Sequence, residues 1–391
     1  MFKTITTKEA AAYFAQGFVP CKKVAARHAL DLHDAIISGS DEAEYSFIDV
    51  LTQVINDIDK SKLNIALTAG HDSRALLAVS TELSPKKTVE CFTWGKNNSD
   101  DVKGARRAAR GMRHLVLDST NISWDFEEVV SRLAGIRSHI GDSLPRVDGI
   151  WMIDNLERSI GEDSARLSGF LGDMLSGAHL TGDFHNDPAK HLQNINLTGV
   201  PNKFDAAGCY REFLEKERKL IKSITDNSEL TVFDIIDLSF RQRQRIQPAI
   251  SGTSSLWNAP MADMRYILKW SKTPLSSRLN QVFYKRKLKQ KFPRIFSTKD
   301  ALLHRRDKAF RKLKGRFDGK GAEMRNFADP GKNQSLNEFL LLATSRFDQR
   351  KLVDINTLTS ARSLTENPSA QAWTLAMLAS SLEVYLTCAD A

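Results

Sequence analysis

The sequence predicts an α/β protein, in which a parallel sheet has helices on both faces and a mostly helical C-terminal half follows. Two observations carry this prediction. Short apolar segments alternate with helical segments between residues 45 and 168, at the spacing of βαβ units. The alternation stops after about residue 182, a polar, loop-like stretch covers 185–201, and the periodicity from residue 204 onward is mostly helical.

Each element of the alternation rests on its own pattern. Apolar residues at 47, 50, 51, 54, 55 and 58 fall on one face of a helix, whereas residues 63–67 form a short apolar run that is typical of a buried strand. Expected in order are a helix at 45–59, a strand at 63–67, a helix through 75–79, a strand at 88–93, a helix from about 99 to 111, a strand at 114–117, a helix at 150–159, a strand at 165–168 and a last helix at 372–386.

These patterns divide the chain into three parts. Residues 1–44 show no strong pattern and are expected to be a short N-terminal extension. Residues 45–184 are the predicted α/β core, and residues 185–391 its mostly helical continuation.

The composition excludes several classes of protein. The chain of 391 residues is 41% hydrophobic and 26% charged, which is typical of a globular protein. It has no run of about 18 apolar residues, so we expect no membrane span. The first residues lack the apolar segment of a signal peptide, and the four cysteines form no CxxC pair. A reducing, cytoplasmic location is therefore the expectation.

The segment after the first strand, residues 68–73 (Thr-Ala-Gly-His-Asp-Ser), has features of a phosphate-binding loop. Gly70 allows the backbone to approach a ligand closely, and the start of the following helix offers unpaired N–H groups. Thr68 and Ser73 add hydroxyl donors, and Asp72 is suited to hold the Mg²⁺ that accompanies ATP. The spacing and lysine of a Walker A loop are absent. The alternative is an ordinary βα turn in which Asp72 or Ser73 caps the helix.

This loop and several later segments resemble motifs of the asparagine synthetase family. Residues 68–73 resemble Ser-Gly-Gly-x-Asp-Ser, the pyrophosphatase (PP) loop of that family, with Ala69 in place of the first glycine. The resemblance runs from about residue 45 to the end and implies an adenine nucleotide alpha hydrolase-like fold. The other matching segments are 92–95 and 99–105 (second strand and Asp-led helix), 167–177 (Ser-Gly-Glu-Gly-x-Asp-Glu-x-x-x-Gly), 259–263 (Val-Pro-Phe-Leu-Asp), 306–308 (Arg-x-Lys) and 374–386 (closing helix).

The resemblance implies ATP and Mg²⁺ as cofactors and gives individual residues a role. The implied catalytic residues are Asp72, Asp173 and Lys308, the implied metal ligands are Asp72 and Asp173, and the implied nucleotide contacts are Thr68, Ala69, Gly70, Asp72, Ser73, Arg74, Trp94 and Gly95.

Four of these assignments compete with simpler interpretations, and a fifth residue, Asp101, is not assigned to the site. Arg74 is as well explained by a surface pair on a helix, and Lys308 lies in a Lys/Arg run where any alignment is easy. Trp94, after the second strand, fits core packing as well as an adenine contact. Asp173 between glycines can be a turn residue, and Asp101 is expected to cap a helix rather than bind a ligand.

The chain departs from the family pattern in two places. Position 2 is Phe2 where the family's glutaminase nucleophile would stand, and some 45 residues are too few for a glutaminase domain. Free ammonia, another amine or a partner glutaminase would then supply the nitrogen. Phe170 and Met174 replace two acids of the family's acid loop, and a Phe cannot accept a proton. We therefore expect that the acid, the amine or both differ from aspartate and ammonia. The remaining Gly-Asp-x-x-x-Gly pattern resembles family members that act on other acids, which implies an acid such as a surface-polysaccharide sugar acid or a polymer-linked acid.

The implied reaction is ATP-dependent amide formation by an AMP-forming ligase or amidotransferase. A substrate carboxylate attacks the α-phosphorus of ATP and pyrophosphate leaves, and an amine then displaces AMP from the acyl-adenylate. The protein's task is to hold the triphosphate in line and to neutralise its charge.

Two alternatives stay open. The segment 264–320 carries 19 Lys and Arg against 3 Asp and Glu, which leaves the rest of the chain at −7. This charge, with Phe283, Tyr284 and Phe292 interleaved, also fits a PP-loop enzyme that modifies RNA. A non-catalytic scaffold of the same fold is the other alternative, suggested by Phe170 and Met174.

Overall fold

The computed structural model describes residues 5–296, 333–352 and 370–390, with gaps inside the first range. These gaps fall at 17–18, 20–22, 40–44, 98, 119–121, 141–143, 145, 158, 181–205, 246, 248–249 and 251–255. The polar stretch 185–201 and Lys308 therefore lie outside the described residues.

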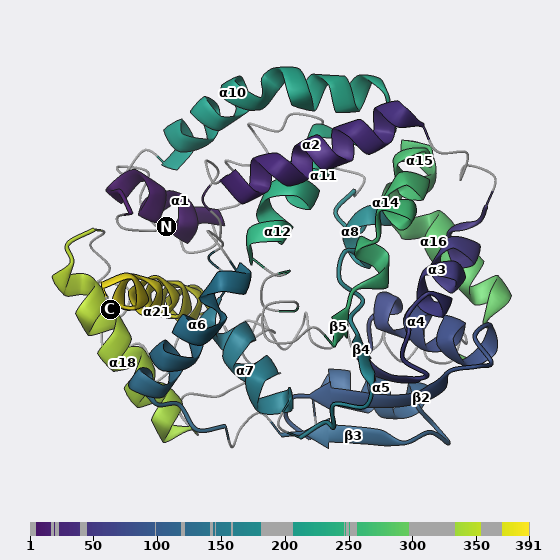
Figure 1. Cartoon of the computed structure of the whole chain (residues 1–391), viewed down its shortest axis with the longest axis horizontal. Coiled ribbons are helices and arrows are strands. Elements are labelled where there is room, and N and C mark those ends of the chain that lie inside the picture. Colours follow the sequence, from purple (N-terminus) through teal and green to yellow (C-terminus); the bar gives the residue numbers. More distant parts are fainter. Residues whose placement is uncertain are drawn as a thin grey trace, which may run out of the picture.

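A sheet of five parallel strands forms the centre of the α/β part, in the order β3-β2-β1-β4-β5 (Figure 1). Ile65 of β1 pairs with Cys91 on one side and with Leu167 on the other, so β1 is a central strand. The strands are β1 (Lys62–Ala66), β2 (Thr88–Trp94), β3 (His114–Leu117), β4 (Ala165–Leu167) and β5 (Trp257–Asn258).

Helices connect the strands and make up most of the C-terminal half. The helices of the first part are α1 (Thr7–Gln16), α2 (Lys23–Ser38), α3 (Phe47–Asn56), α4 (His71–Glu82), α5 (Asp100–Ala108), α6 (Phe126–Ile140), α7 (Val147–Glu157) and α8 (Gly172–Leu175). Those that follow are α10 (Ala206–Asp226), α11 (Val232–Ile236), the π-helix η4 (Asp237–Arg241), α12 (Gln242–Arg245), the 3-10 helix η5 (Pro260–Ala262), α14 (Met264–Ser271), α15 (Leu275–Arg278), the 3-10 helix η6 (Leu279–Gln281), α16 (Val282–Lys291), α18 (Gln334–Gln349) and α21 (Ala370–Asp390).

Caps in the sequence explain where two of these helices begin. Ser46 accepts the backbone N–H of Asp49, and the Asp49 carboxylate accepts the N–H of Ser46, which is a capping box at the start of α3. Ser99 accepts the N–H of Val102 and so starts α5 at Asp100.

Two hydrophobic clusters cover the two faces of the sheet. Neighbouring residues of β2 point to opposite faces, and accordingly Cys91 belongs to one cluster and Phe92 to the other. The Cys91 cluster includes residues of α3, α4, α14 and α16, and the Phe92 cluster includes residues of α6, α7, α18 and α21. Away from the sheet, α2 and α10 lie side by side (Figure 1).

The predicted parallel sheet and helical C-terminal half are confirmed. The helices and strands expected between residues 45 and 168 are found within a few residues of their predicted bounds. Four elements were not expected: α1 and α2 in the segment without a strong pattern, α6 between the third and fourth strands, and the two-residue strand β5. The division at residues 44 and 184 stays a prediction. No helix among the described residues combines the length and apolar character needed to span a bilayer.

Candidate functional site

Two loops meet where the strand order of the sheet reverses. The chain adds β2 and β3 on one side of β1, and β4 and β5 on the other. The connections that follow β1 and β4 therefore leave the sheet in opposite directions. A crevice opens between them at the carboxyl ends of the two strands, and parallel α/β sheets bind ligands at such a point. Residues 67–73 follow β1 and residues 168–173 follow β4, so both predicted motifs lie at this point.

The loop after β1 is shaped by its own residues. The N–H of Thr68 donates to Ser73 Oγ at 3.0 Å, and the N–H of Gly70 donates to Thr68 Oγ1 at 3.0 Å. The N-cap of α4 is Gly70, and no side chain caps the helix. The alternative in which Asp72 or Ser73 caps it is therefore not observed. The first N–H groups of α4, which a helix cannot satisfy with its own carbonyls, follow directly after this loop, as at helix ends that bind anions.

Ala69, which stands where the family has a glycine, is accommodated by a second glycine. A Cβ at Gly104 of α5 would lie 2.9 Å from the Ala69 Cα, which is closer than real side chains approach. The Ala69 methyl thus occupies space that Gly104 leaves free, and its side chain packs on α5.

Glycines also let the loop after β4 lie directly on Asp72. A Cβ at Gly169 would be 3.1 Å from the Ser73 backbone nitrogen, and one at Gly172 would be 2.6 Å from the Asp72 Cγ. Between them, Leu171 has φ 72, in the left-handed region that a branched residue rarely adopts. Its side chain is buried, and this packing holds the strained backbone.

The two predicted metal ligands interact electrostatically. Burial and the Asp173 charge raise the pKa of Asp72 to about 7, although the Tyr284 hydroxyl and the Asp173 backbone amide bond to its carboxylate and oppose this shift. The Asp173 residue as a whole is exposed, but protein atoms surround most of its carboxylate. The burial of the carboxylate and the Asp237 charge raise the pKa of Asp173. Both carboxylates therefore lie where a cation would be stabilising.

Tyr284 of α16 is a contact of Asp72 that the sequence did not indicate. Its hydroxyl donates to Asp72 Oδ1 at 2.8 Å. The ring is fully buried, between Phe47 at a centroid distance of 5.3 Å and Trp270 at 5.9 Å. Burial and the Asp72 charge raise the pKa of Tyr284 well above its usual value, so the hydroxyl keeps the proton that it donates.

A cavity of about 230 Å³ opens between the two loops and the end of β2. It contains most of the predicted nucleotide contacts. Its lining is Ala66, Leu67, Thr68, Gly70, Asp72, Ser73, Phe92, Thr93, Trp94, Asp101, Ser168 and Gly169.

Some predicted site residues take other positions. Ala69, Arg74 and Gly95 do not line this cavity, and Asp173 lies beside it through its contact with Asp72. The Arg74 guanidinium donates to the Gly70 carbonyl at 3.1 Å and lies 4.9 Å from the Phe296 ring centroid, so it is no simple surface pair.

Two residues of the cavity wall need a revised interpretation. Trp94 both lines the cavity and packs on Phe92 and Trp257, at centroid distances of 5.8 and 6.5 Å. Ser99 caps α5, whereas Asp101, expected as a cap, lines the cavity. Its place in the first turn of α5, after the second strand, was the signal that could have marked it.

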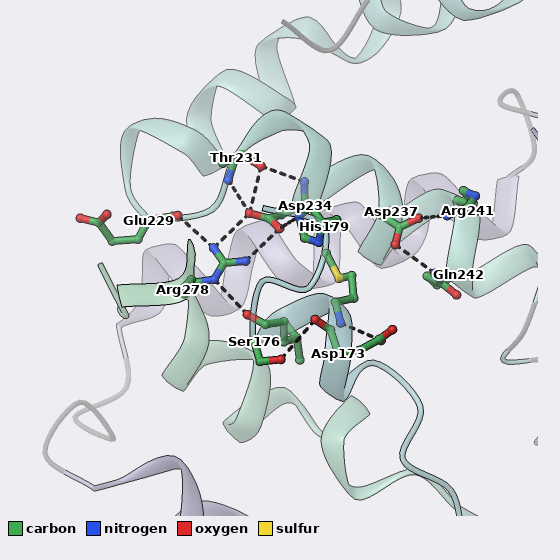
Figure 2. A network of polar contacts seen from close by, with 12 residues as sticks. Asp173, Ser176, His179, Glu229, Thr231, Asp234, Asp237, Arg241, Gln242 and Arg278 are labelled. Atoms are coloured by element: carbon green, nitrogen blue, oxygen red, sulfur yellow. Dashed lines mark hydrogen bonds and ion pairs between the residues drawn. The ribbon is translucent and has the colours of Figure 1, made fainter. Parts of the chain in front are cut away.

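A buried ion network anchors the chain that follows Asp173 (Figure 2). Arg278 donates to both carboxylate oxygens of Asp234, at 2.8 and 3.0 Å, and to the Leu175 carbonyl at 2.9 Å. His179 Nε2 lies 2.8 Å from Asp234 Oδ1. Burial alone would raise the pKa of Asp234, but the hydrogen bond from His179 and the charge of Arg278 outweigh it and lower this pKa to about 2.

Two aromatic residues of the basic segment, Tyr284 and Phe292, belong to the core. Both are fully buried, whereas the basic side chains between them face solvent and Phe283 is half-buried. The rings of Tyr284 and Phe292 therefore cannot stack on nucleic acid bases, and these two residues do not support the RNA alternative.

The donor set fits Mg²⁺ bound together with a triphosphate. Mg²⁺ is usually held by one or two carboxylates, with phosphate oxygens and waters completing its octahedron. Asp72 and Asp173 supply two carboxylates, beside a loop of N–H and hydroxyl donors. Within the described ranges no group of three or more His, Cys, Asp and Glu side chains could hold a metal ion, so a metal held by protein ligands alone is not indicated there.

Comparisons with known proteins leave the family open. No protein family model matches the chain, and no curated protein matches it. The function must therefore be argued from the site itself.

Proposed function

We propose that this protein forms an amide at the expense of ATP, by adenylating a substrate carboxylate, and that it is an asparagine synthetase-like ligase of adenine nucleotide alpha hydrolase-like fold. The observation that carries the proposal is the meeting of residues 68–73 and 168–173 at the switch point of the sheet. Asp72 and Asp173 interact there, beside a cavity lined by Thr68, Gly70 and Ser73.

The residues divide the work according to their chemistry. The hydroxyls of Thr68 and Ser73 and the first N–H groups of α4 bind the β- and γ-phosphates. Asp72 and Asp173 hold Mg²⁺, which would neutralise charge on the departing pyrophosphate. Trp94, half-buried beside the cavity, offers a ring face to the adenine.

The proposed reaction has two steps, and in each of them one bond forms while another breaks. A carboxylate oxygen bonds to the α-phosphorus while the bond to the bridging oxygen breaks, and pyrophosphate leaves with that electron pair. An amine then attacks the acyl carbon, AMP leaves, and the amine gives up a proton. Ammonia, another amine or a partner glutaminase supplies the nitrogen.

The second loop supports an acid other than aspartate. Phe170 and Met174 stand in place of two acids, and both side chains are buried, so neither position offers an acidic group. The exposed cations of α16, among them Lys285, Arg286 and Lys289, lie on the helix that contacts Asp72 through Tyr284. Such a surface favours an anionic substrate, for which we propose an acidic sugar or a polymer-linked acid.

Acid-dependent exchange of labelled pyrophosphate into ATP tests the proposal directly. A panel of uronic acids, amino acids and acidic oligosaccharides would be offered to the wild-type protein and to Asp72→Asn. We expect exchange with at least one acid, AMP as the product once ammonia is added, and loss of both activities in the variant. Exchange that the variant retains in full would contradict the assignment of Asp72, whereas a wild-type protein that shows neither exchange nor AMP formation with any acid of the panel would contradict the proposed reaction for these substrates.

A further inference from the structure

The segment Arg278–Tyr284 contacts Asp72 of the first loop and the chain that directly follows the second loop. At its start, Arg278 donates to the Leu175 carbonyl at 2.9 Å. At its end, Tyr284 donates to Asp72 Oδ1 at 2.8 Å. One stretch of seven residues thus links the loop of Asp173 to Asp72, although its own sequence lies more than 100 residues from either loop.

Two further hydrogen bonds join this segment to the chain that follows Asp173. The N–H of Asn280 donates to the Leu180 carbonyl at 2.8 Å, and the Gln281 amide donates to Ser176 Oγ at 2.7 Å. Gln281 is buried, so its bond to Ser176 is shielded from water. The chain that carries Asp173 is therefore held from 175 to 180 by one neighbouring segment.

The backbone of this segment is strained where it turns toward Asp72. Asn280 and Gln281 have φ 54 and φ 59, two successive residues in the left-handed region without a glycine. Such conformations persist only where surrounding contacts hold them, and they gather at functional sites. The turn ends at Val282, where α16 begins, and it places Tyr284, in the first turn of α16, beside Asp72.

The Tyr284 hydroxyl is directed at Asp72 by its ring packing. The ring has no exposed surface and is fixed by Phe47 and Trp270. A carboxylate accepts about four hydrogen bonds, so the bond from Tyr284 orients Asp72 and leaves acceptor positions for a metal.

We infer that Tyr284 is a positioning residue, which orients the Asp72 carboxylate toward Mg²⁺ and is itself placed by the strained turn at Asn280 and Gln281. This inference rests on the proposed function, because it assigns Asp72 to the metal. Removing the hydroxyl alone should free the carboxylate to rotate, and should weaken metal binding more than folding.

The test uses Mn²⁺ as the probe, with the α,β-methylene analogue of ATP, which is not cleaved at the reacting bond. The Mn²⁺ affinity of the full chain with saturating analogue would be measured by electron paramagnetic resonance for the wild type, Tyr284→Phe and Tyr266→Phe. Tyr266 is the control, because it is fully buried in the same aromatic cluster and senses the Asp72 charge, but no hydrogen bond joins it to Asp72 among the described contacts. Thermal unfolding without nucleotide reports any loss of structure.

We expect Tyr284→Phe to weaken Mn²⁺ binding about tenfold, with metal-free binding of the analogue unchanged, and Tyr266→Phe to bind Mn²⁺ like the wild type. Wild-type Mn²⁺ affinity in Tyr284→Phe, or an equal loss in both variants, would overturn the inference. A parallel Asp72→Asn sample separates a failure of the positioning role of Tyr284 from a failure of the proposed function. If it loses Mn²⁺ while Tyr284→Phe does not, only the positioning role fails. If it binds Mn²⁺ normally, the proposed role of Asp72 fails as well.

Discussion

The loop after β1 and the loop after β4 belong to the same candidate site, but different kinds of contact hold them. Hydrogen bonds between Thr68, Gly70 and Ser73, at most five residues apart, shape the first loop. The second depends on partners about 100 residues away, Arg278 for Leu175 and Gln281 for Ser176. The first loop is therefore a local structure, whereas the second is positioned by the helical C-terminal half.

The largest effect should follow from removing the Arg278 side chain, whose contacts position the chain after the second loop. Arg278 and Asp234 are both fully buried, so Arg278→Met removes the guanidinium from a buried carboxylate and leaves it only the contacts with His179 and Thr231. We expect the free energy of unfolding to fall by about 3–5 kcal/mol, measured by urea denaturation. Arg218→Met is the control, because the Arg218 pair with Glu215 is largely exposed and should contribute less than about 1 kcal/mol. Equal losses of unfolding free energy in the two variants would mean that the buried contacts of Arg278 stabilise the protein no more than an exposed ion pair does. The second loop would then not depend on this distant partner.

The contact between the loops should be the next most sensitive. In Gly172→Ala the new Cβ would clash with Met261 Sδ and lie 2.6 Å from the Asp72 Cγ, so the Met261 and Asp72 side chains must move. We expect a loss of about 2–3 kcal/mol in unfolding free energy and no measurable binding of Mg·ATP by calorimetry.

Gly135→Ala on α6 is the matched control for this clash. A Cβ there meets no atom within 4 Å, and alanine favours the helix by about 0.5–1 kcal/mol. A Gly172→Ala protein that binds Mg·ATP like Gly135→Ala would show that the two loops need not touch.

The Asp72 carboxylate should give the first loop its own pH dependence. The folded protein holds a proton on Asp72 up to about pH 7, whereas the unfolded chain releases it near 3.8. Because the folded pKa is raised, the stability of the metal-free protein falls as the pH rises through this window. Asp72→Asn should remove this decline. Since water still reaches part of this side chain, we expect the variant to be more stable than the wild type by about 2 kcal/mol at pH 8, with no difference near pH 4.

Urea denaturation at the two pH values measures this difference. Glu82→Gln, an exposed change at the other end of α4, should follow the wild type at both. An Asp72→Asn protein that parallels the wild type at pH 4 and pH 8 would mean that Asp72 is not the group that is costly to ionise.

The smallest effect is expected within the local loop. Thr68→Ala removes the acceptor of the Gly70 N–H, and should lower the free energy of unfolding by about 1 kcal/mol. Thr52→Ala is the control, because the Thr52 hydroxyl donates a hydrogen bond to the Ile48 carbonyl within its own helix, α3. Affinity for the α,β-methylene analogue of ATP should fall in Thr68→Ala and not in Thr52→Ala. The same affinity in both would argue against a phosphate contact at Thr68.

This difference between the loops also explains what could be predicted from the sequence. Strand β1, the loop at 68–73 and helix α4 follow from short-range patterns, and the structure reproduces them. Strand β5 has only two residues, too few for a period to be visible. The bond between Tyr284 and Asp72 joins residues 212 positions apart, so no local spacing could indicate it.

The charge pattern was informative about the surface but not about the aromatics. Lys285 and Arg286 are exposed as a basic run suggests, while Tyr284 and Phe292 turn inward. Residues 284, 288 and 292 recur every fourth position, as on a buried helix face, and that period distinguishes core packing from an RNA-stacking surface.

The central claim is that Asp72 and Asp173 act together on one Mg·ATP site, and a double-mutant cycle tests it most directly. Calorimetric titration with Mg²⁺ and the α,β-methylene analogue of ATP would compare the wild type, Asp72→Asn, Asp173→Asn and the double variant. We predict that each single change weakens binding at least about tenfold and that the double variant is little worse than either, because both carboxylates serve one metal. Wild-type affinity in either single variant, or losses that simply add, would contradict the claim.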